Sequence, residues 1–222
     1  VDDKELQIYV NQVGMWLVNQ TERPNLPWRF GVLDEDTINA FAAPGGYVFI
    51  SKGLFMLFRN ESELAGVLAH EIGHVLVQHH LEDIKERARN GIMKDVAAEL
   101  ISQELGAGWG TLVKELTNLG VDVWESGLNR DDEFEADQVG VVIAARAGYD
   151  PYGLLGVLDT LNRINPSNSE SYKQMHATHP EPNARILLLD SQMAETMGSY
   201  ITSPVNSAKL YQFQNQLENK KG

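Results

Sequence analysis

The chain is organised around one hexapeptide, Ala69-His70-Glu71-Ile72-Gly73-His74, which lies inside an apolar run with helical periodicity. Residues four positions apart share one face of an α-helix, so His70 and His74 can direct their imidazoles at one metal ion. Glu71 projects beside them, where a general base for hydrolysis would have to be. The H-E-x-x-H pattern therefore predicts the metal site of a zinc-dependent hydrolase.

The surroundings of this motif favour a functional site over a chance coincidence. Asn60 and Glu63 form a plausible capping box at the start of the helix. Apolar residues then recur with the spacing of a helix packed into a core: Leu64, Val67, Leu68, Ile72, Val75 and Leu76. Histidines and a carboxylate buried without partners would be costly, and a bound metal ion would offset that cost. The alternative, a purely structural helical protein, predicts that no metal is bound.

A catalytic zinc site usually takes three protein ligands, so a further ligand is needed. Cysteine is absent, which leaves histidine and carboxylate side chains as candidates. Residues 131–148 predict a helix that begins with acidic residues and becomes apolar. Glu133 and Asp137 share one face of it, while Glu135 is turned away. One of the two could bind the metal while the other accepts an N–H from a ligating histidine.

Length and charge limit the other classes of function. The 222 residues suit a single domain, 1–222, and the net charge of −13 argues against partners such as nucleic acid or anionic lipid. No run approaches the roughly 18 apolar residues of a membrane span. Val1 in place of an initiator methionine is compatible with a processed chain that has lost a signal peptide or lipid anchor.

The first part of the chain predicts a helix followed by a small sheet. An amphipathic helix is expected after Asp2 and Asp3, and a strand over residues 28–33. Two β-rich runs, 38–42 and 47–50, flank Pro44-Gly45-Gly46 and predict a hairpin, with a short apolar helix over 53–58. The hairpin is either one layer of the core or an edge strand that pairs with an extended peptide. The expected fold class is α+β, mainly helical, with this sheet packed on the H-E-x-x-H helix.

Two further histidines follow the motif. Nine residues beyond His70, His79 is turned about 180° to the opposite face of the helix and His80 also lies off the ligand face, so both are expected to face solvent. Residues 81–105 predict a helix with a charged face, and glycines at 106, 108 and 110 predict a break.

Several motifs together resemble one metallopeptidase family, that of the CaaX prenyl endoprotease, the HtpX heat-shock protease and the periplasmic BepA-type proteases. The matching segments, in chain order, are Asn39-Ala40-Phe41-Ala42-Ala43-Pro44-Gly45-Gly46-Tyr47, His70-Glu71-Ile72-Gly73-His74, Asn129-Arg130-Asp131-Asp132-Glu133-Phe134-Glu135-Ala136-Asp137, and Thr178-His179-Pro180 with Arg185. They span most of the chain and occur in the family's order.

The resemblance implies a gluzincin-type, zincin-like fold and a role for each matching position. One zinc ion per chain would be held by His70, His74 and Glu133, with Glu71 as catalytic base and Asp137 behind the ligands. Asn39, Ala40, Phe41 and Ala42 would form the edge strand that receives substrate. His179 and Arg185 would lie near the metal and stabilise the oxyanion. In some BepA-like members a loop histidine instead occupies the open metal position and holds the enzyme latent, a role for which His176 competes with His179.

The function implied by the resemblance is a zinc-dependent endopeptidase acting on extended or misfolded proteins. The location implied is periplasmic or associated with the cell envelope, and the implied partners include the outer-membrane assembly machinery. The alternative is a zincin-fold chaperone or assembly factor with little proteolytic turnover. The family's integral-membrane members carry spanning helices that are missing here, so a prenylated membrane peptide is not the expected substrate. BepA-type proteins carry a helical-repeat domain after the protease. Residues 203–222 are too few for one repeat of about 34 residues, so that module is expected to be absent or cut away, and these residues to be a tail or the start of the missing module.

Overall fold

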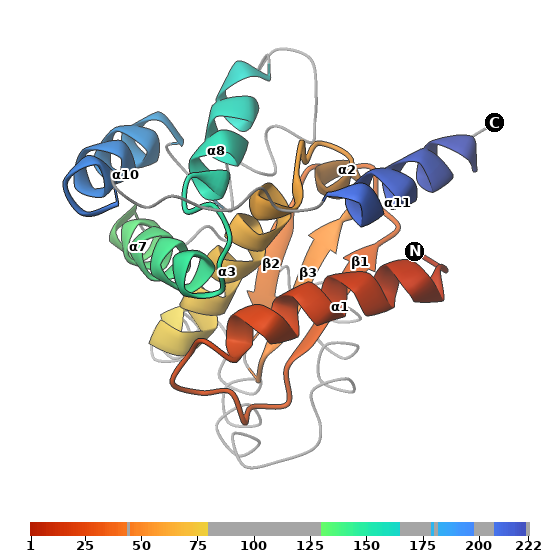
Figure 1. Ribbon diagram of the computed structural model, residues 1–222, viewed down its shortest axis with the longest axis horizontal. Helices are drawn as coiled ribbons and strands as arrows, with labels where there is room; N and C mark the ends of the chain where they lie inside the picture. The colour runs from red at the N-terminus through yellow and green to blue at the C-terminus, as the bar shows by residue number, and fades with distance from the viewer. Residues whose placement is uncertain (44, 80–129, 165–178, 180–181, 198–206, 221–222) are drawn as a thin grey trace, which may run out of the picture.

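The computed structural model describes residues 1–43, 45–79, 130–164, 179, 182–197 and 207–220, and Figure 1 shows their helices packed with a small sheet. In chain order the elements are α1 (Lys4–Val18), β1 (Arg29–Leu33), β2 (Ala40–Ala43), β3 (Tyr47–Ser51), α2 (Lys52–Phe55), α3 (Glu61–Val77), α7 (Arg130–Arg146), α8 (Gly153–Arg163), α10 (Pro182–Thr196) and α11 (Ala208–Asn219). The predicted α+β, mainly helical class is confirmed.

The sheet has the strand order β1-β3-β2. β2 and β3 pair antiparallel, from Ala40 opposite Ile50 to Ala43 opposite Tyr47, so the predicted hairpin is confirmed. β1 pairs in parallel with the other side of β3. Within the described part of the chain, β2 is therefore an edge strand whose outer side carries no neighbouring strand.

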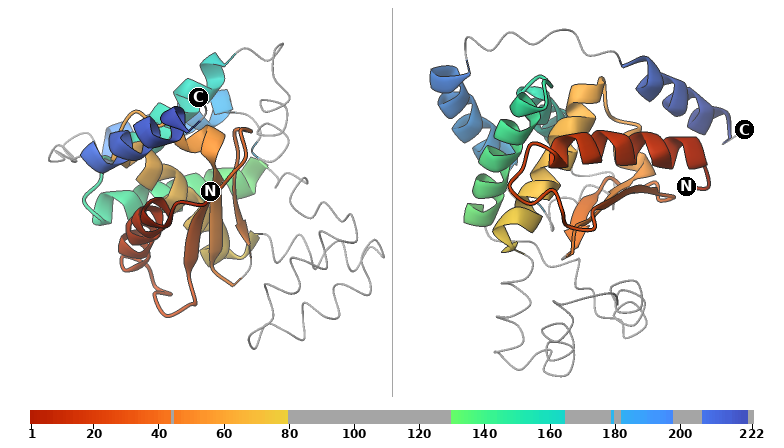
Figure 2. Two further views of the ribbon diagram at one scale, coloured as in Figure 1. Left: turned by 90° about the vertical axis from the view of Figure 1, so that its right-hand side faces the viewer. Right: turned by 60° about the horizontal axis from the view of Figure 1, so that its bottom comes forward.

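The helix α1 forms for the reasons that its sequence indicates. Asp3 caps it by accepting a hydrogen bond from the backbone N–H of Leu6. Its buried stripe recurs at helical spacing and packs against β1 and α3: Leu6, Tyr9, Val10, Val13 and Leu17. The predicted N-terminal helix is thus confirmed, and it covers one face of the sheet (Figure 2).

The central helix is α3, which packs against β2, α7 and α8. Asn60 caps it through the backbone N–H of Glu63, as predicted, but the Glu63 carboxylate accepts from the backbone N–H of Arg59 in place of that of Asn60. The helix is buried on almost every side, which explains why its sequence is so continuously apolar. It ends at Val77, and the capping residue that follows, Gln78, adopts the left-handed backbone conformation with φ 67° and ψ 27°.

Small residues allow α3 and α7 to cross in backbone contact. A Cβ atom on Gly140 would lie 2.8 Å from the backbone nitrogen of His70, and one on Gly73 would lie 3.0 Å from the carbonyl oxygen of Ala136. The approach at Gly140 leaves no room for a side chain, and the approach at Gly73 is tighter than almost all real Cβ contacts. The crossing brings the first turns of α7 beside the H-E-x-x-H motif.

Several predictions concern other parts of the chain. The short apolar helix expected over 53–58 is found as α2, beginning one residue earlier and ending at Phe55. None of the helices in the described ranges has the length and apolar character needed to cross a bilayer. The helix predicted over 81–105, the glycine break, His80 and His176 lie outside the described residues.

Candidate metal centre

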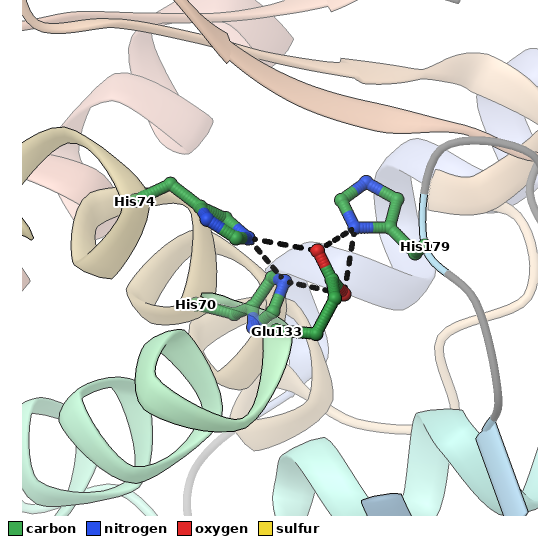
Figure 3. A group of neighbouring side chains, drawn as sticks. All are labelled: His70, His74, Glu133 and His179. Atoms are coloured by element: carbon green, nitrogen blue, oxygen red, sulfur yellow. Dashed lines mark hydrogen bonds and ion pairs between the residues drawn. The ribbon is translucent and has the colours of Figure 1, made fainter. Parts of the chain in front are cut away.

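The two histidines of the motif meet at the side of α3 that faces α7. One helical turn apart, His70 and His74 bring their Nε2 atoms to 3.0 Å from each other (Figure 3). Both rings are buried, with exposed fractions of 4% and 0%. Two imidazole nitrogens this close, facing the same space, are the arrangement that a shared metal ion requires.

A carboxylate from α7 faces this pair. Glu133 is fully buried, and its Oε1 and Oε2 atoms lie 3.3 Å from His74 Nε2 and 3.7 Å from His70 Nε2. The sequence placed Glu133 and Asp137 on one face of a helix, and it is Glu133 whose oxygens approach both Nε2 atoms. Figure 3 shows its side chain entering from the opposite helix.

A third histidine completes the cluster from a distant part of the chain. His179 Nδ1 lies 3.2 Å and 3.1 Å from the two oxygens of Glu133. Its Nε2 lies 3.1 Å from the carbonyl oxygen of Ala40 on the edge strand. One ligand atom from each of His70, His74, Glu133 and His179 can be chosen so that all lie within 4.8 Å of one another.

Charge also fits a divalent cation at this place. Among the described residues of the site, Glu71, Glu133 and Asp137 are buried carboxylates, and Arg185 is the buried guanidinium among them. The three carboxyl groups outnumber the one guanidinium in a region shielded from water. Imidazole nitrogens and carboxylate oxygens are donors that suit zinc or a similar divalent ion.

Asp137 and Arg185 lie directly behind the histidines. Asp137 Oδ1 is 2.9 Å from His70 Nδ1 and accepts a hydrogen bond of 2.6 Å from Arg185 Nη2. Arg185, on α10, also donates from Nε to Asp137 Oδ2 at 2.7 Å and places Nη1 2.7 Å from Glu133 Oε2. The guanidinium thus holds the two carboxylates in one network with His70.

Glu71 is the member of the motif with an unused acceptor. Its Oε1 lies 3.7 Å from His179 Nε2, while its buried Oε2 has no hydrogen-bond partner within the described structure. Burial raises the pKa of the Glu71 carboxyl above its ordinary value. A buried carboxyl oxygen without a partner beside a metal-binding cluster leaves a position where a water or a substrate group can bind.

The charges of the cluster act differently on its other members. Although burial opposes ionisation of Glu133, the charges of His179 and Arg185 bring the pKa of its carboxyl well below the ordinary range. Burial by itself lowers the pKa of His179, but the adjacent Glu133 carboxylate raises it to about 9. For Asp137, burial is likewise outweighed by Arg185, and its pKa is lowered.

The structure corrects the prediction for His79, which is buried with 6% of its surface exposed. The prediction assumed that α3 continues to His79, whereas the helix ends at Val77 and the left-handed Gln78 turns the chain back. His79 Nδ1 therefore lies 2.9 Å from His74 Nδ1, and its Nε2 lies 3.3 Å from Glu135 Oε2. The sequence offered no signal for this turn, because glutamine is a good helix former and a non-glycine residue rarely adopts the left-handed conformation.

The predicted substrate segment lies on the strand nearest the cluster. Ala40, Phe41 and Ala42 belong to β2, and Asn39 directly precedes it. The Asn39 carbonyl accepts a hydrogen bond of 2.9 Å from Ser51 N–H, so in an antiparallel pair the backbone groups of Ala40 face away from β3. The contact between His179 and the Ala40 carbonyl is in line with that orientation.

Residues 4–193 match Peptidase family M48. The chain belongs to this family. It is 31% identical over 192 residues to the beta-barrel assembly-enhancing protease of Escherichia coli O157:H7, an alignment that covers 84% of this chain and 38% of that protein. The resemblance stated from the sequence motifs is therefore confirmed.

Other M48-like relatives also carry protease names. The mitochondrial metalloendopeptidase OMA1 of Schizosaccharomyces pombe is 30% identical over 199 residues, covering 88% of this chain and 56% of that protein. The metalloprotease YcaL of Escherichia coli K12 is 30% identical over 170 residues, covering 72% of this chain and 59% of that protein. A family of metalloproteases implies a metal ion and does not favour the chaperone alternative. The chain spans less than two thirds of the length of these relatives.

Proposed function

We propose that this chain is a zinc-dependent endopeptidase that hydrolyses peptide bonds in extended or misfolded proteins. The observation that carries the proposal is the buried cluster of His70, His74, Glu133 and His179 with the unpartnered Glu71 Oε2 beside it. Membership of a peptidase family supports the reaction type. The donor set of the site, three imidazoles and one carboxylate, supports zinc as the metal, with one ion per chain.

In this proposal His70, His74 and Glu133 hold the metal. Bound there, zinc would supply a Lewis acid that polarises a carbonyl group and makes water nucleophilic near neutral pH. The two histidines must bind as neutral imidazoles, and Asp137 favours this for His70 because it lies 2.9 Å from the Nδ1 that would carry the proton. Arg185 directs three nitrogens at Asp137 and Glu133, so we assign it to positioning these carboxylates ahead of stabilising an oxyanion.

Glu71 would act as the general base and then as the general acid. Burial raises the pKa of the Glu71 carboxyl, which favours its holding a proton taken from water until that proton is returned to the leaving amine. Its Oε2 is free to accept the hydrogen bond of an attacking water. No other buried carboxylate of the described site has an unpartnered oxygen.

The edge strand would bind the substrate backbone. Ala40 offers outward-facing backbone groups, and pairing with them would hold an extended segment with little dependence on its side chains. This supports unfolded or extended protein as the substrate class. Asn39, Phe41 and Ala42 would flank the pairing site.

His179 would control access to this site. Its ring contacts both Glu133 and the Ala40 carbonyl, so it occupies part of the metal-binding cluster and part of the substrate strand at once. We propose that His179 holds the enzyme latent in this position.

The wider setting is proposed from the named relatives. The beta-barrel assembly-enhancing proteases support a periplasmic or cell-envelope location and an outer-membrane assembly partner for the protein that contains this chain. Fractionation of cells that produce the protein from its own full-length gene would test the location. Recovery in the cytoplasm would contradict it.

Chelation tests the enzymatic proposal against a non-hydrolytic one. The purified chain, incubated with unfolded casein, should cleave it, lose cleavage after treatment with 1,10-phenanthroline and recover it with added zinc. Because latency would lower the rate, the His179→Ala variant is assayed in parallel. Casein left intact by both zinc-loaded proteins would contradict the proposal and favour a chaperone or structural role.

A further inference from the structure

One buried histidine has no role in the mechanism proposed above. His79 follows the end of α3, and its Nδ1 lies 2.9 Å from the Nδ1 of the proposed ligand His74. The two rings are inclined at 69° with their centroids 5.1 Å apart, so they meet edge to face and not as a stack. The short contact is therefore a hydrogen bond in which one nitrogen donates and the other accepts.

Metal binding would fix the direction of this bond. His74 Nε2 faces the cluster, 3.3 Å from Glu133 Oε1, and it is the nitrogen whose lone pair a metal ion would take. The proton of the neutral His74 ring must then be on Nδ1, which makes His74 the donor. His79 Nδ1 must accept, and the neutral His79 ring therefore carries its proton on Nε2.

The far side of His79 matches that assignment. Its Nε2 lies 3.3 Å from Glu135 Oε2 and 3.8 Å from Asp132 Oδ1, both on α7. An ionised carboxylate can accept hydrogen bonds but cannot donate them. These two carboxylates therefore stabilise the form of His79 with a proton on Nε2. The chain of donors runs from His74 through His79 to Glu135, and every atom along it has a matching partner.

The two proposed histidine ligands thus have different supports. His70 faces the carboxylate Asp137, which Arg185 holds at 2.6 and 2.7 Å. His74 faces a second imidazole, that of His79, which a carboxylate from α7 holds in turn. Gln78 makes this possible because its left-handed backbone, φ 67°, returns the chain against the last turn of α3.

We propose that His79 is a positioning residue that fixes the tautomer and the ring orientation of the metal ligand His74 by accepting its Nδ1–H. The proposal rests on the metal site proposed above. It assigns a structural purpose to the turn after α3. Through this turn His79 contacts both His74 on α3 and Glu135 on α7. Partners of metal ligands of this kind typically contribute about 10–100-fold to metal affinity.

A pair of variants separates the hydrogen bond from simple packing. His79→Phe keeps a ring of similar size but removes the acceptor, whereas His79→Asn keeps an acceptor near the Nδ1 position and loses volume. Zinc affinity, measured by competition with a chromophoric chelator, should fall about 10–100-fold in His79→Phe and recover most of that loss in His79→Asn. An affinity for His79→Phe equal to that of the wild type, or an equal loss in both variants, would overturn the proposal.

Controls separate this proposal from the metal site itself. Circular dichroism of the metal-free proteins shows whether each variant folds, and Glu218→Gln, an exposed change on α11, should leave zinc affinity unchanged. A wild-type protein that binds no zinc would refute the metal site. If the wild-type protein binds zinc and the His79 variants bind it with the same affinity, only the role of His79 would be refuted.

Nuclear magnetic resonance tests the proton positions without any variant. In long-range ¹H–¹⁵N spectra of the zinc-loaded wild-type protein, His79 should show a protonated Nε2 and an unprotonated Nδ1, and His74 a protonated Nδ1. A His79 ring protonated on Nδ1 would overturn the proposal whatever the affinities show.

Discussion

The backbone nitrogen of His70 lies so close to Gly140 that a Cβ atom on Gly140 would be only 2.8 Å from it. This contact sets the distance between α3 and α7. His70 and His74 come from one helix and Glu133 from the other, so the spacing of the cluster depends on a glycine seven residues after Glu133.

Gly140→Ala should therefore lower both stability and zinc affinity. Alanine improves helix propensity by about 1 kcal/mol, but its methyl group would press on backbone atoms that cannot rotate away, and such overpacking costs about 1–3 kcal/mol or more. We expect a net loss in the free energy of unfolding, measured by urea denaturation. Gln138→Ala, at an exposed position of the same helix, should change stability by less than about 0.5 kcal/mol. Equal stabilities for Gly140→Ala and the wild type would show that the helices are not held this closely.

A hydrogen bond at the other end of α3 also links distant segments. The Tyr9 hydroxyl donates to Glu61 Oε2 at 2.6 Å, joining α1 to the first turn of α3. Tyr149 lies 3.3 Å from the other oxygen of Glu61, so the carboxylate keeps one partner when Tyr9 is changed. Tyr9→Phe should lower the free energy of unfolding by about 1–2 kcal/mol in urea denaturation. The exposed Tyr152→Phe serves as its control, and the same stability for both variants would contradict a role for this bond.

The motif and its periodicity predicted most of what surrounds the site. The spacing of His70 and His74, the Asn60 cap and the apolar run indicated α3, because these depend only on local helical geometry. The shared face of Glu133 and Asp137 indicated the second helix for the same reason. The Pro-Gly-Gly turn between two β-rich runs indicated the hairpin.

What the sequence could not predict depends on tertiary contact. Helical phase extended past Gln78 predicts that His79 faces solvent, whereas Gln78 adopts a left-handed conformation that is unusual for a non-glycine residue. The close crossing at Gly140 requires knowing which helix lies against which. The contact of His179 with Ala40 joins residues 139 positions apart, and no local pattern predicts it.

The proposed latch predicts a gain of activity on removal. His179→Ala would free the Ala40 carbonyl and one side of Glu133, so cleavage of a short fluorogenic peptide should become faster than with the wild type at equal zinc content. The same comparison with casein tests whether larger substrates respond as well. Slower cleavage of the short peptide by His179→Ala would contradict the latch and favour a catalytic role for His179.

The most direct test of the account is Glu71→Gln, compared with the wild type and with the exposed Glu218→Gln. The amide keeps the size of the side chain but cannot take a proton, so zinc content and folding should be preserved. Casein cleavage should fall by about 10²–10⁴-fold, the usual contribution of a general base. We expect a folded, zinc-loaded and nearly inactive Glu71→Gln protein beside an unaffected Glu218→Gln control. Cleavage by zinc-loaded Glu71→Gln at the wild-type rate would contradict the proposed hydrolytic centre.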